Sequence, residues 1–316
     1  MINWGFIGAG SIARSNLAPA VHQARGAVLH AVSSRDTSRA AALEATRTHS
    51  DYRALLDDPD VDVVYIALHN SSHREWAEEA LRAGKHVVCE KPLTLSAKEV
   101  DALAGTAEAS GKLLVEAAWN RWHPRTRDME SLLSRGDIGD VTHVSAYFDG
   151  PTPAVGNYRF APELGGGALY DVGYYAISAA LAAHGWREPL VREVRRERWS
   201  PDSADRMTSF ILEFPGGGTA DVFSGLTGEW VETFAVRGTA GDFQLLDRAF
   251  TAGAHPSRMA GTIRERRFSS SYAEVDPYLL MVEEVTRAAA GESAYLVPLH
   301  QSHAIAKVMD DVRAAV

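Results

Sequence analysis

The sequence predicts an α/β protein: a doubly wound parallel sheet first, then an α+β domain with an open, mostly antiparallel sheet. Strand and helix patterns alternate over residues 3–117, and a glycine motif follows the first strand. After Pro124, consecutive strand patterns replace the alternation. A chain of 316 residues is long for one core, so we expect two domains, residues 1–119 and 120–316.

In the N-terminal part, short runs rich in Val, Ile and Leu predict buried parallel strands. These runs are 3–8, 27–33, 61–68, 86–89 and 113–117. Helical patterns lie between them, for example at 37–45, 73–83 and 96–109. Gly84 and Gly111 each follow a helical stretch and precede a strand, as C-terminal glycine caps do. Pro19 falls inside the first helix and should bend or split it.

The C-terminal part has a helical pattern at 125–133 and then strand patterns that alternate polar and apolar residues. The strands are 141–148, 207–214, 219–224, 231–237 and 243–246. Pro215 to Gly218 separates two of them as a hairpin turn would, so we expect an antiparallel sheet with one polar side. The basic run 192–198 suits a solvated strand face. We expect helices at 176–183, 277–290 and 300–315.

Charge, apolar run length and cysteine content argue against several classes of protein. The net charge of -9 and a pI near 5.7 argue against a nucleic-acid partner, which needs clustered positive charge. No apolar run reaches the roughly eighteen residues of a membrane span. Cys89 is the single cysteine, so no internal disulfide can form. A strand pattern close to Met1 leaves no room for a signal peptide, and we expect a cytoplasmic protein.

A G-x-G-x-x-A motif begins at Gly8, directly after the first strand. Gly8 permits a tight turn, Gly10 lets backbone approach a pyrophosphate, and Ala13 allows close packing of helix on strand. Ser11 and Ile12 open the helix, whose N-terminus offers amide groups to phosphate. We therefore predict a dinucleotide-binding Rossmann domain.

The second strand ends at Ser33-Ser34-Arg35, where an NAD enzyme usually has an acidic residue. Hydroxyl groups and an arginine favour the 2′-phosphate of NADP, and Arg39 lies near enough to join them. NADP is the predicted cofactor, with NAD possible.

Three motifs in order resemble the Gfo/Idh/MocA family of oxidoreductases: the glycine motif, Cys89-Glu90-Lys91-Pro92, and the G-G-G-A-L-Y-D-V-G segment at 165–173. The segment 116–124 is similar to dimeric dihydrodiol dehydrogenases and NADP-dependent D-xylose dehydrogenases. Tyr175 stands where most of the family has the histidine of D-x-G-x-H. The dihydrodiol and xylose dehydrogenases resemble this chain in having tyrosine at that position.

The resemblance implies roles for further residues. The cofactor would be contacted by Leu68, His69, Asn70, His73, Glu90, Lys91 and Arg159. Tyr158-Arg159 resembles a W-R pair that touches the cofactor in relatives, with tyrosine in place of tryptophan. The substrate would be contacted by Lys91, Trp119, Arg121, His123, Tyr158, Asp171 and Tyr175.

The candidate catalytic residues are Lys91, Asp171 and Tyr175. Asp171 and Tyr175 are four residues apart and share one helix face, whereas Tyr174 points about 100° away. The hypothesis is that Tyr175 takes the proton of a substrate hydroxyl while hydride passes to the nicotinamide. Lys91 lowers the pKa of the tyrosine and hydrogen-bonds the reacting oxygen, and Asp171 orients substrate or Lys91.

The favoured function is an NAD(P)-dependent dehydrogenase or reductase for a sugar, a cyclic polyol or a trans-dihydrodiol. Two alternatives stay open: an NAD-dependent glycosidase of the same family, and a non-catalytic NAD(P)-binding sensor. His69 and His73 have no third ligand nearby, so we expect no metal. In relatives the open face of the C-terminal sheet pairs with a second subunit, which implies a homodimer or larger homo-oligomer.

Overall fold

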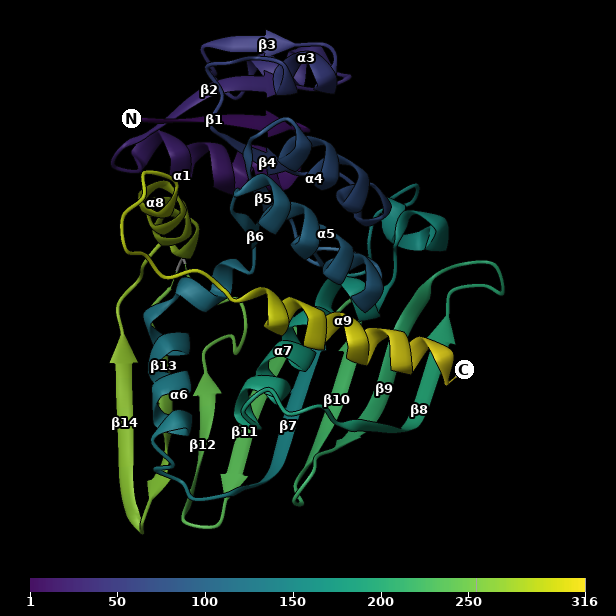
Figure 1. Ribbon diagram of the computed structural model, residues 1–316. Helices are drawn as coiled ribbons and strands as arrows, with labels where there is room; N and C mark the ends of the chain where they lie inside the picture. Colours follow the sequence, from purple (N-terminus) through teal and green to yellow (C-terminus); the bar gives the residue numbers. More distant parts are fainter. Residues whose placement is uncertain (254, 316) are drawn as a thin grey trace. The chain divides into compact units, whose positions relative to one another are not determined.

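The computed structural model describes residues 1–253 and 255–315, in two compact units that are taken separately below (Figure 1). The first unit contains Met1–Trp122 and Asp276–Ser302. The second contains His123–Val275 and the chain from His303 onward. The predicted division at 119/120 placed Asp276–Ser302 in the second domain, whereas in the structure this segment belongs to the first unit. No helix of the described residues is long and apolar enough to cross a membrane.

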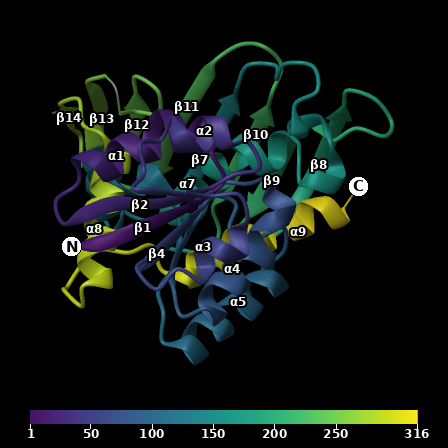
Figure 2. The ribbon, with the colours of Figure 1, turned by 90° about the horizontal axis from the view of Figure 1, so that it is seen from above.

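The first unit is built on a six-stranded sheet in which all neighbouring strands are parallel. The order is β3-β2-β1-β4-β5-β6, the doubly wound arrangement that the alternating patterns predict (Figure 1). Figure 2 shows β2, β1 and β4 of this sheet from above. The strands are β1 Ile2–Ile7, β2 Ala27–Ser33, β3 Arg47–His49, β4 Val63–Ile66, β5 His86–Cys89 and β6 Leu114–Glu116.

The helices of the first unit begin and end at residues with a clear local cause. The Asp36 carboxylate accepts from two amides at the start of α2, and Gly111 ends α5 with φ +64°, as predicted. Pro19 splits the first helix into a π-helical turn, η1, and an α-helix, α1. The helices are η1 Ala13–Leu17, α1 Ala18–Gln23, α2 Thr37–Ala41, α3 Tyr52–Leu56, η2 Asn70–Ser72, α4 His73–Arg82, α5 Ala97–Ser110, η3 Trp119–Trp122 and α8 Pro277–Ala289.

The second unit is built on an eight-stranded sheet in the order β14-β13-β12-β11-β7-β10-β9-β8. Among the described strands, β7 and β10 form its one parallel pair, so the expected mostly antiparallel sheet is confirmed. Pro215 to Gly218 connects the antiparallel strands β9 and β10, as predicted. The strands are β7 Val141–Asp149, β8 Leu190–Arg198, β9 Asp205–Glu213, β10 Thr219–Gly225, β11 Val231–Gly238, β12 Gly241–Leu246, β13 Ser257–Ile263 and β14 Arg266–Tyr272.

Helices cover one face of this sheet. Helix α7 (Tyr174–Ala183) lies against β7 and β10, and α6 (Pro124–Ser134) lies against β13 (Figure 1). On β7 the side chains of Val144, Ala146 and Phe148 are buried beneath α7, and those of Ser145 and Tyr147 alternate with them on the other face. That other face carries no helix of the second unit's described residues. The remaining helices are η4 Tyr158–Phe160, η5 Pro162–Leu164, η6 Leu169–Gly173 and α9 Leu299–Ala314, within which the division between units falls.

Candidate active site

Gly8 and Gly10 of the first motif lack a side chain for different reasons. Gly8 has φ +98°, and a Cβ there would lie 2.4 Å from the Ala67 carbonyl oxygen, so the packing of the unit itself requires it. A Cβ on Gly10 would meet nothing nearer than 3.9 Å. The space at Gly10 is therefore not needed by the protein. It fits a pyrophosphate bound by amides of the first helical turn. These amides precede Arg14, whose N–H donates to the Gly10 carbonyl where the helix begins.

The end of β2 offers hydroxyl groups and cations. Ser33 is fully buried, and among the described residues its Oγ has no hydrogen-bond partner. Ser34 Oγ accepts from the Asp36 amide at 3.2 Å. Arg35 is exposed, and the half-exposed Asp36 carboxylate lies 3.1 Å from Arg39 Nε. Two hydroxyl groups at the strand end, followed in the sequence by two exposed arginines, fit the ribose 2′-phosphate of NADP.

The segment after β4 contains His69, Asn70 and His73. His69 and Asn70 lie at the carboxyl end of the strand, where the doubly wound fold binds ligands. His73 is fully buried, with its ring nitrogens 2.8 Å from the Pro92 oxygen and 3.2 Å from the Leu68 oxygen. Burial lowers the pKa of His73 to about 4, so the ring is neutral and one nitrogen donates. The ring thus lies between two loops of the cofactor side and donates to one of the two carbonyl oxygens.

The segment after β5 places a buried carboxyl beside Lys91. Glu90 Oε1 accepts from the Tyr65 hydroxyl at 2.6 Å, and Oε2 accepts from the Lys91 amide at 3.3 Å. Burial raises the pKa of Glu90, although the Tyr65 bond and the charge of Lys91 oppose it. Lys91 and Pro92 are joined by a cis peptide bond. Glu90 therefore orients the backbone that carries Lys91.

Glu116 was not among the predicted site residues, yet it supports the same segment. It is 2% exposed, and its carboxylate accepts from the Leu93 amide at 2.7 Å and from Ser302 Oγ at 2.6 Å. The signal available in the sequence was a charged residue inside the apolar run 113–117. A buried acid in such a run needs donors, and here it links the backbone after Pro92 to the start of α9.

The predicted substrate residues Trp119, Arg121 and His123 lie in packed surroundings. Trp119 stacks on Tyr278 with ring centroids 4.8 Å apart, and Arg121 Nη2 donates to Gln301 Oε1 at 2.9 Å, both within the first unit. His123, in the second unit, caps α6 by accepting the Arg125 amide at its Nδ1. Burial lowers the pKa of His123 to about 4, and the ring is neutral.

In the second unit, Arg159 and Asp171 form a two-bonded ion pair. Arg159 Nε and Nη2 donate to the two carboxylate oxygens of Asp171 at 2.6 and 2.9 Å. The Arg159 amide donates to Asn157 Oδ1, and its guanidinium carbon lies 5.0 Å from the Tyr158 ring centroid. A Cβ on Gly166 would lie 2.6 Å from the carbonyl oxygens of both Tyr158 and Arg159. The glycine segment is thus packed directly against the Tyr158-Arg159 backbone.

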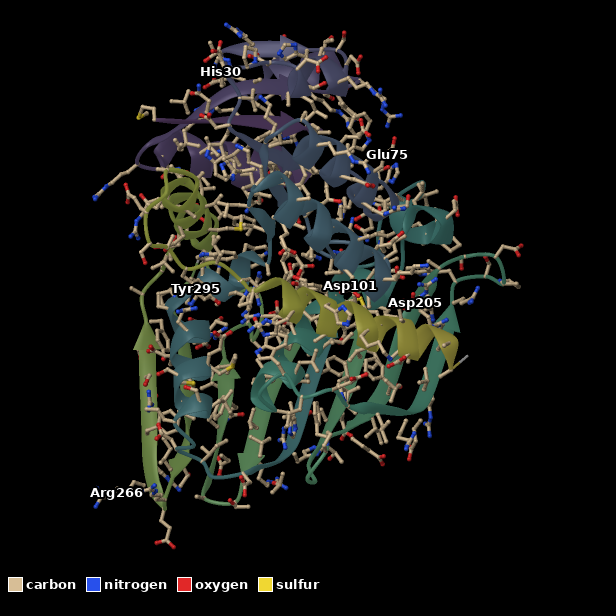
Figure 3. The ribbon with its side chains drawn as sticks, in the orientation of Figure 1. His30, Glu75, Asp101, Asp205, Arg266 and Tyr295 are labelled. Carbon is tan, nitrogen blue, oxygen red and sulfur yellow. The ribbon has the colours of Figure 1, made fainter. Side chains whose placement is uncertain are left out.

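The same glycine segment is fixed at its other end by Asp205, a second residue that the sequence did not single out. Asp205 Oδ2 accepts from the Leu169 amide at 2.9 Å and from Thr208 Oγ1 at 2.8 Å (side chain in Figure 3). Gly167 has φ +111°, and a Cβ there would lie 2.1 Å from Asp205 Oδ1. The glycines let a buried carboxylate bind the start of the η6–α7 helix.

Tyr175 lies one turn after Asp171 on that helix. It is 6% exposed, and its ring centroid is 5.7 Å from those of both Phe148 and Tyr174. The residues 169–173 form a π-helical turn, a local irregularity that occurs frequently at functional sites. Asp171 and Tyr175, with Arg159 paired to Asp171, therefore gather around one helix start, whereas His123 caps α6.

One group of His and Asp side chains in the described residues has the spacing of metal ligands: His30, Asp58 and Asp60 (His30 in Figure 3). His30 Nε2 lies 3.7 Å from Asp58 Oδ2 and 4.0 Å from Asp60 Oδ2. Arg47 Nη1 lies 3.0 and 3.1 Å from the same two oxygens. A guanidinium already neutralises these carboxylates, so we propose no metal there.

Comparison with known proteins agrees with this geometry. A family model described as an oxidoreductase family with an NAD-binding Rossmann fold matches residues 2–117, and the GFO/IDH/MocA C-terminal domain matches residues 126–244. The chain is 30% identical to D-xylose 1-dehydrogenase (NADP(+)) 2 of Haloferax volcanii, over 98% of this chain and 95% of that protein. It is 28% identical to trans-1,2-dihydrobenzene-1,2-diol dehydrogenase of Bos taurus, over 100% and 97%.

A solved structure gives the same result in three dimensions. The 3-ketoreductase KijD10 from Actinomadura kijaniata, in complex with NADP and TDP-benzene, superposes with a TM-score of 0.89. The two proteins are 26% identical, with 99% of this chain and 97% of that chain covered. The chain belongs to the GFO/IDH/MocA family of oxidoreductases.

Proposed function

We propose that this chain is an NADP-preferring oxidoreductase that transfers hydride between the nicotinamide and a hydroxyl-bearing carbon of its substrate. The cofactor cradle of the first unit carries this proposal. It combines the unfilled space at Gly10, the helix N-terminus behind it and the orphaned hydroxyl of Ser33. Gly8, Ser11 and Ile12 complete the phosphate-binding turn.

Preference for NADP over NAD follows from charges at the end of β2. Arg35 and Arg39 are both exposed, and neither a glutamate nor an aspartate ends the strand. The nearby Asp36 carboxylate accepts from the amides of Ser38 and Arg39, which holds it at the start of α2. These bonds and the ion pair with Arg39 reduce the repulsion between this carboxylate and a 2′-phosphate.

The cofactor, when bound, supplies the acceptor for the hydride. In oxidation, Tyr175 accepts the proton of the substrate hydroxyl; in reduction it returns that proton to the carbonyl oxygen. Lys91 hydrogen-bonds the reacting oxygen and favours the phenolate form of the tyrosine. The low exposure of Tyr175 supports this role, because a charge acts more strongly where water is excluded.

We propose a sugar, a cyclic polyol or a trans-dihydrodiol as the substrate class. The names of relatives support it, since they include a D-xylose dehydrogenase and a dihydrodiol dehydrogenase. A ketosugar is the corresponding substrate in the reducing direction. Trp119, Arg121, His123 and Tyr158 remain proposed substrate contacts, although the first three have structural partners.

The test is the absorbance of reduced nicotinamide, with NADP or NAD offered against pooled aldoses, inositols and trans-dihydrodiols. We expect turnover with NADP to exceed turnover with NAD by about tenfold or more, which is the value of one charge-assisted hydrogen bond. The Tyr175→Phe variant should bind NADP normally and lose about 100-fold or more in turnover. Wild-type turnover in this variant would contradict the catalytic assignment.

Other outcomes of the same assay separate the alternatives. NADP binding without oxidation of any pool and without reduction of the matching ketosugars would favour a sensor. Tightly held NAD that survives purification, together with sugar release from glycosides, would favour a glycosidase.

We also propose that the chain works as a homodimer through the open face of the eight-stranded sheet. Tyr147 and Phe223 stack on this face with ring centroids 4.2 Å apart and planes 5° apart. They border a depression of about 310 Å³ that Ser209 and Ile211 also line. Aromatic surface of this kind is typical of protein interfaces. The cytoplasm remains the proposed compartment, in agreement with the buried free thiol of Cys89.

A further inference from the structure

We propose that the Arg159–Asp171 ion pair sets the charge at Tyr175: Asp171 holds the Arg159 guanidinium where it stabilises the phenolate form of the tyrosine. This inference rests on the proposed role of Tyr175 as acid and base. It assigns Arg159 a positioning role within the second unit, beyond contact with the cofactor, and makes Asp171 its anchor.

The geometry of the pair carries the inference. Two N–H···O bonds of 2.6 and 2.9 Å join the planar guanidinium to both carboxylate oxygens, the arrangement that best fixes an arginine. The side chains of Arg159 and Asp171 are 31% and 15% exposed, so water screens their charges only in part. Asp171 stands one turn before Tyr175 and shares a helix face with it, so the ion pair and the phenol lie on the same side of the helix.

The backbone on both sides of the pair is held in place. Gly166 packs on the carbonyl oxygens of Tyr158 and Arg159, and the Ala204 amide donates to the Phe160 oxygen at 3.0 Å. Asp205 fixes the start of the helix that carries Asp171. A rigidly mounted charge costs little reorganisation when it stabilises an anion.

Electrostatics agree with this placement. Burial alone would lower the pKa of Arg159, but the charge and hydrogen bonds of Asp171 raise it well above its usual range. Tyr158 and Tyr175 add smaller contributions in the same direction. Interaction between two charges is mutual, so a guanidinium that gains from a phenolate also stabilises that phenolate.

Other charged groups on the elements around α7 have partners of their own. At the end of β7, Asp149 accepts from the Thr227 amide and hydroxyl. On β11, Glu232 accepts from the amides of Phe250 and Thr251 and from Trp230. On β10, Asp221 is exposed on the open face of the sheet. Arg125 of α6 donates to backbone oxygens of the β12–β13 region. Tyr174 adjoins Tyr175 on α7, and Tyr158 precedes Arg159.

The pair makes a prediction that a merely structural bridge does not. Arg159→Gln leaves the Asp171 carboxylate uncompensated and should raise the pKa of Tyr175 by about one unit or more. Asp171→Asn keeps an oxygen that can accept from the Arg159 guanidinium and hold it in place, but it removes the negative charge, and it should therefore lower that pKa. Opposite shifts from the two halves of one bridge are the expected signature.

Tyrosinate absorbance measures the shifts without any substrate. Each variant is titrated with NADP bound, alongside the same variant carrying Tyr175→Phe, and the difference isolates the ionisation of Tyr175. Arg159→Lys keeps the charge and should stay close to wild type. Arg135→Gln is the matched control, because Arg135 makes two bonds to Asp137 at 2.6 and 3.0 Å on the exposed surface of the same unit.

Unmoved titrations, or shifts in the same direction for Arg159→Gln and Asp171→Asn, would overturn the proposal. So would a weakened affinity for NADP in Arg159→Gln with an unmoved titration, which would assign Arg159 to cofactor holding alone. If Arg159→Gln does not fold, Asp171→Asn alone still decides, since an unmoved titration there contradicts the inference. Failure of the proposed function is distinguishable, because it would appear as full turnover in Tyr175→Phe.

Discussion

Gly8 and Gly10 stand two residues apart, but the structure gives their substitution opposite consequences. Gly8→Ala forces an L side chain to φ +98° and to 2.4 Å from a carbonyl oxygen. We expect a loss of about 3 kcal/mol or more in the free energy of unfolding. Gly10→Ala places its methyl group in open space, so stability should change by less than about 1 kcal/mol. Its affinity for NADP should fall by about tenfold or more, because the methyl group occupies the space of the pyrophosphate.

Urea unfolding and NADP titration of both variants check this contrast. Each variant serves as the other's control, since the chemical change is the same. Normal NADP affinity in Gly10→Ala would show that the cofactor phosphates lie elsewhere. Near-normal stability in Gly8→Ala would show that the β1–β4 region relaxes around the methyl group.

His184 links stability to acid pH. It is 2% exposed, stacks on Phe214 at 3.7 Å, and burial lowers its pKa to about 4. Because the unfolded chain binds a proton near pH 6.5, stability is lost as pH falls from about 6.5 to 4, by up to about 3 kcal/mol. His184→Phe removes this contribution and should reduce the acid loss, whereas His300→Phe at an exposed position should not. Thermal unfolding between pH 7 and 4 measures both, and equal acid loss in all three proteins would refute the assignment.

At the scale of single residues, the sequence was sufficient for groups that belong to motifs and insufficient for groups that act through distant partners. The glycine motif and Lys91 could be placed because strand, turn and helix patterns flank them. Glu116 could not, because its role depends on Ser302, 186 residues further along the chain. Asp205 likewise binds the Leu169 amide, and no local pattern announces that bond.

At the scale of elements, buried strands were predictable and polar edge strands were not. The predicted runs for β2 and β5 agree with the structure at both ends. The strands β3, β13 and β14 were not predicted from the sequence. β3 is three residues long, and β14 reads R-R-F-S-S-S-Y, with little apolar alternation. Such strands form because a neighbouring strand supplies hydrogen bonds, and this support is not visible in a local window.

Asp205 joins β9 to the helix that carries Asp171 and Tyr175, and its loss should act on that whole element. Asp205→Ala leaves the Leu169 amide and Thr208 hydroxyl without their acceptor inside the unit. We expect a loss of about 2–3 kcal/mol of stability, the cost of unsatisfied buried donors. Asp242→Ala, on an exposed position of β12, is the control. Urea unfolding compares the two, and equal stabilities would mean that water replaces the carboxylate.

At the scale of the whole molecule, the two sides of the eight-stranded sheet differ in how their apolar groups are covered. On one side, α7 covers Val144, Ala146 and Phe148. On the other, the stacked rings of Tyr147 and Phe223 have no helix of the second unit over them. An aromatic pair at the centre of a face is expected to be covered by a partner, and a second copy of the same sheet is the simplest complement.

The proposed homodimer therefore predicts a change of mass on a single substitution. Phe223→Asp puts a second carboxylate near Asp221 on both copies of a two-fold interface, and it also removes a ring from the proposed centre. Light scattering at micromolar concentration should report a dimer for the wild-type chain and a monomer for this variant. Leu190→Asp, at a 59% exposed position on the edge strand β8, should stay dimeric. A monomeric wild-type chain, or a Phe223→Asp variant that keeps the wild-type mass, would contradict a dimer interface on the open face. If the variant is monomeric and still oxidises substrate, each copy has a complete site of its own; if turnover is lost with dimerisation, the open sheet also stabilises the helix that carries Tyr175 from behind.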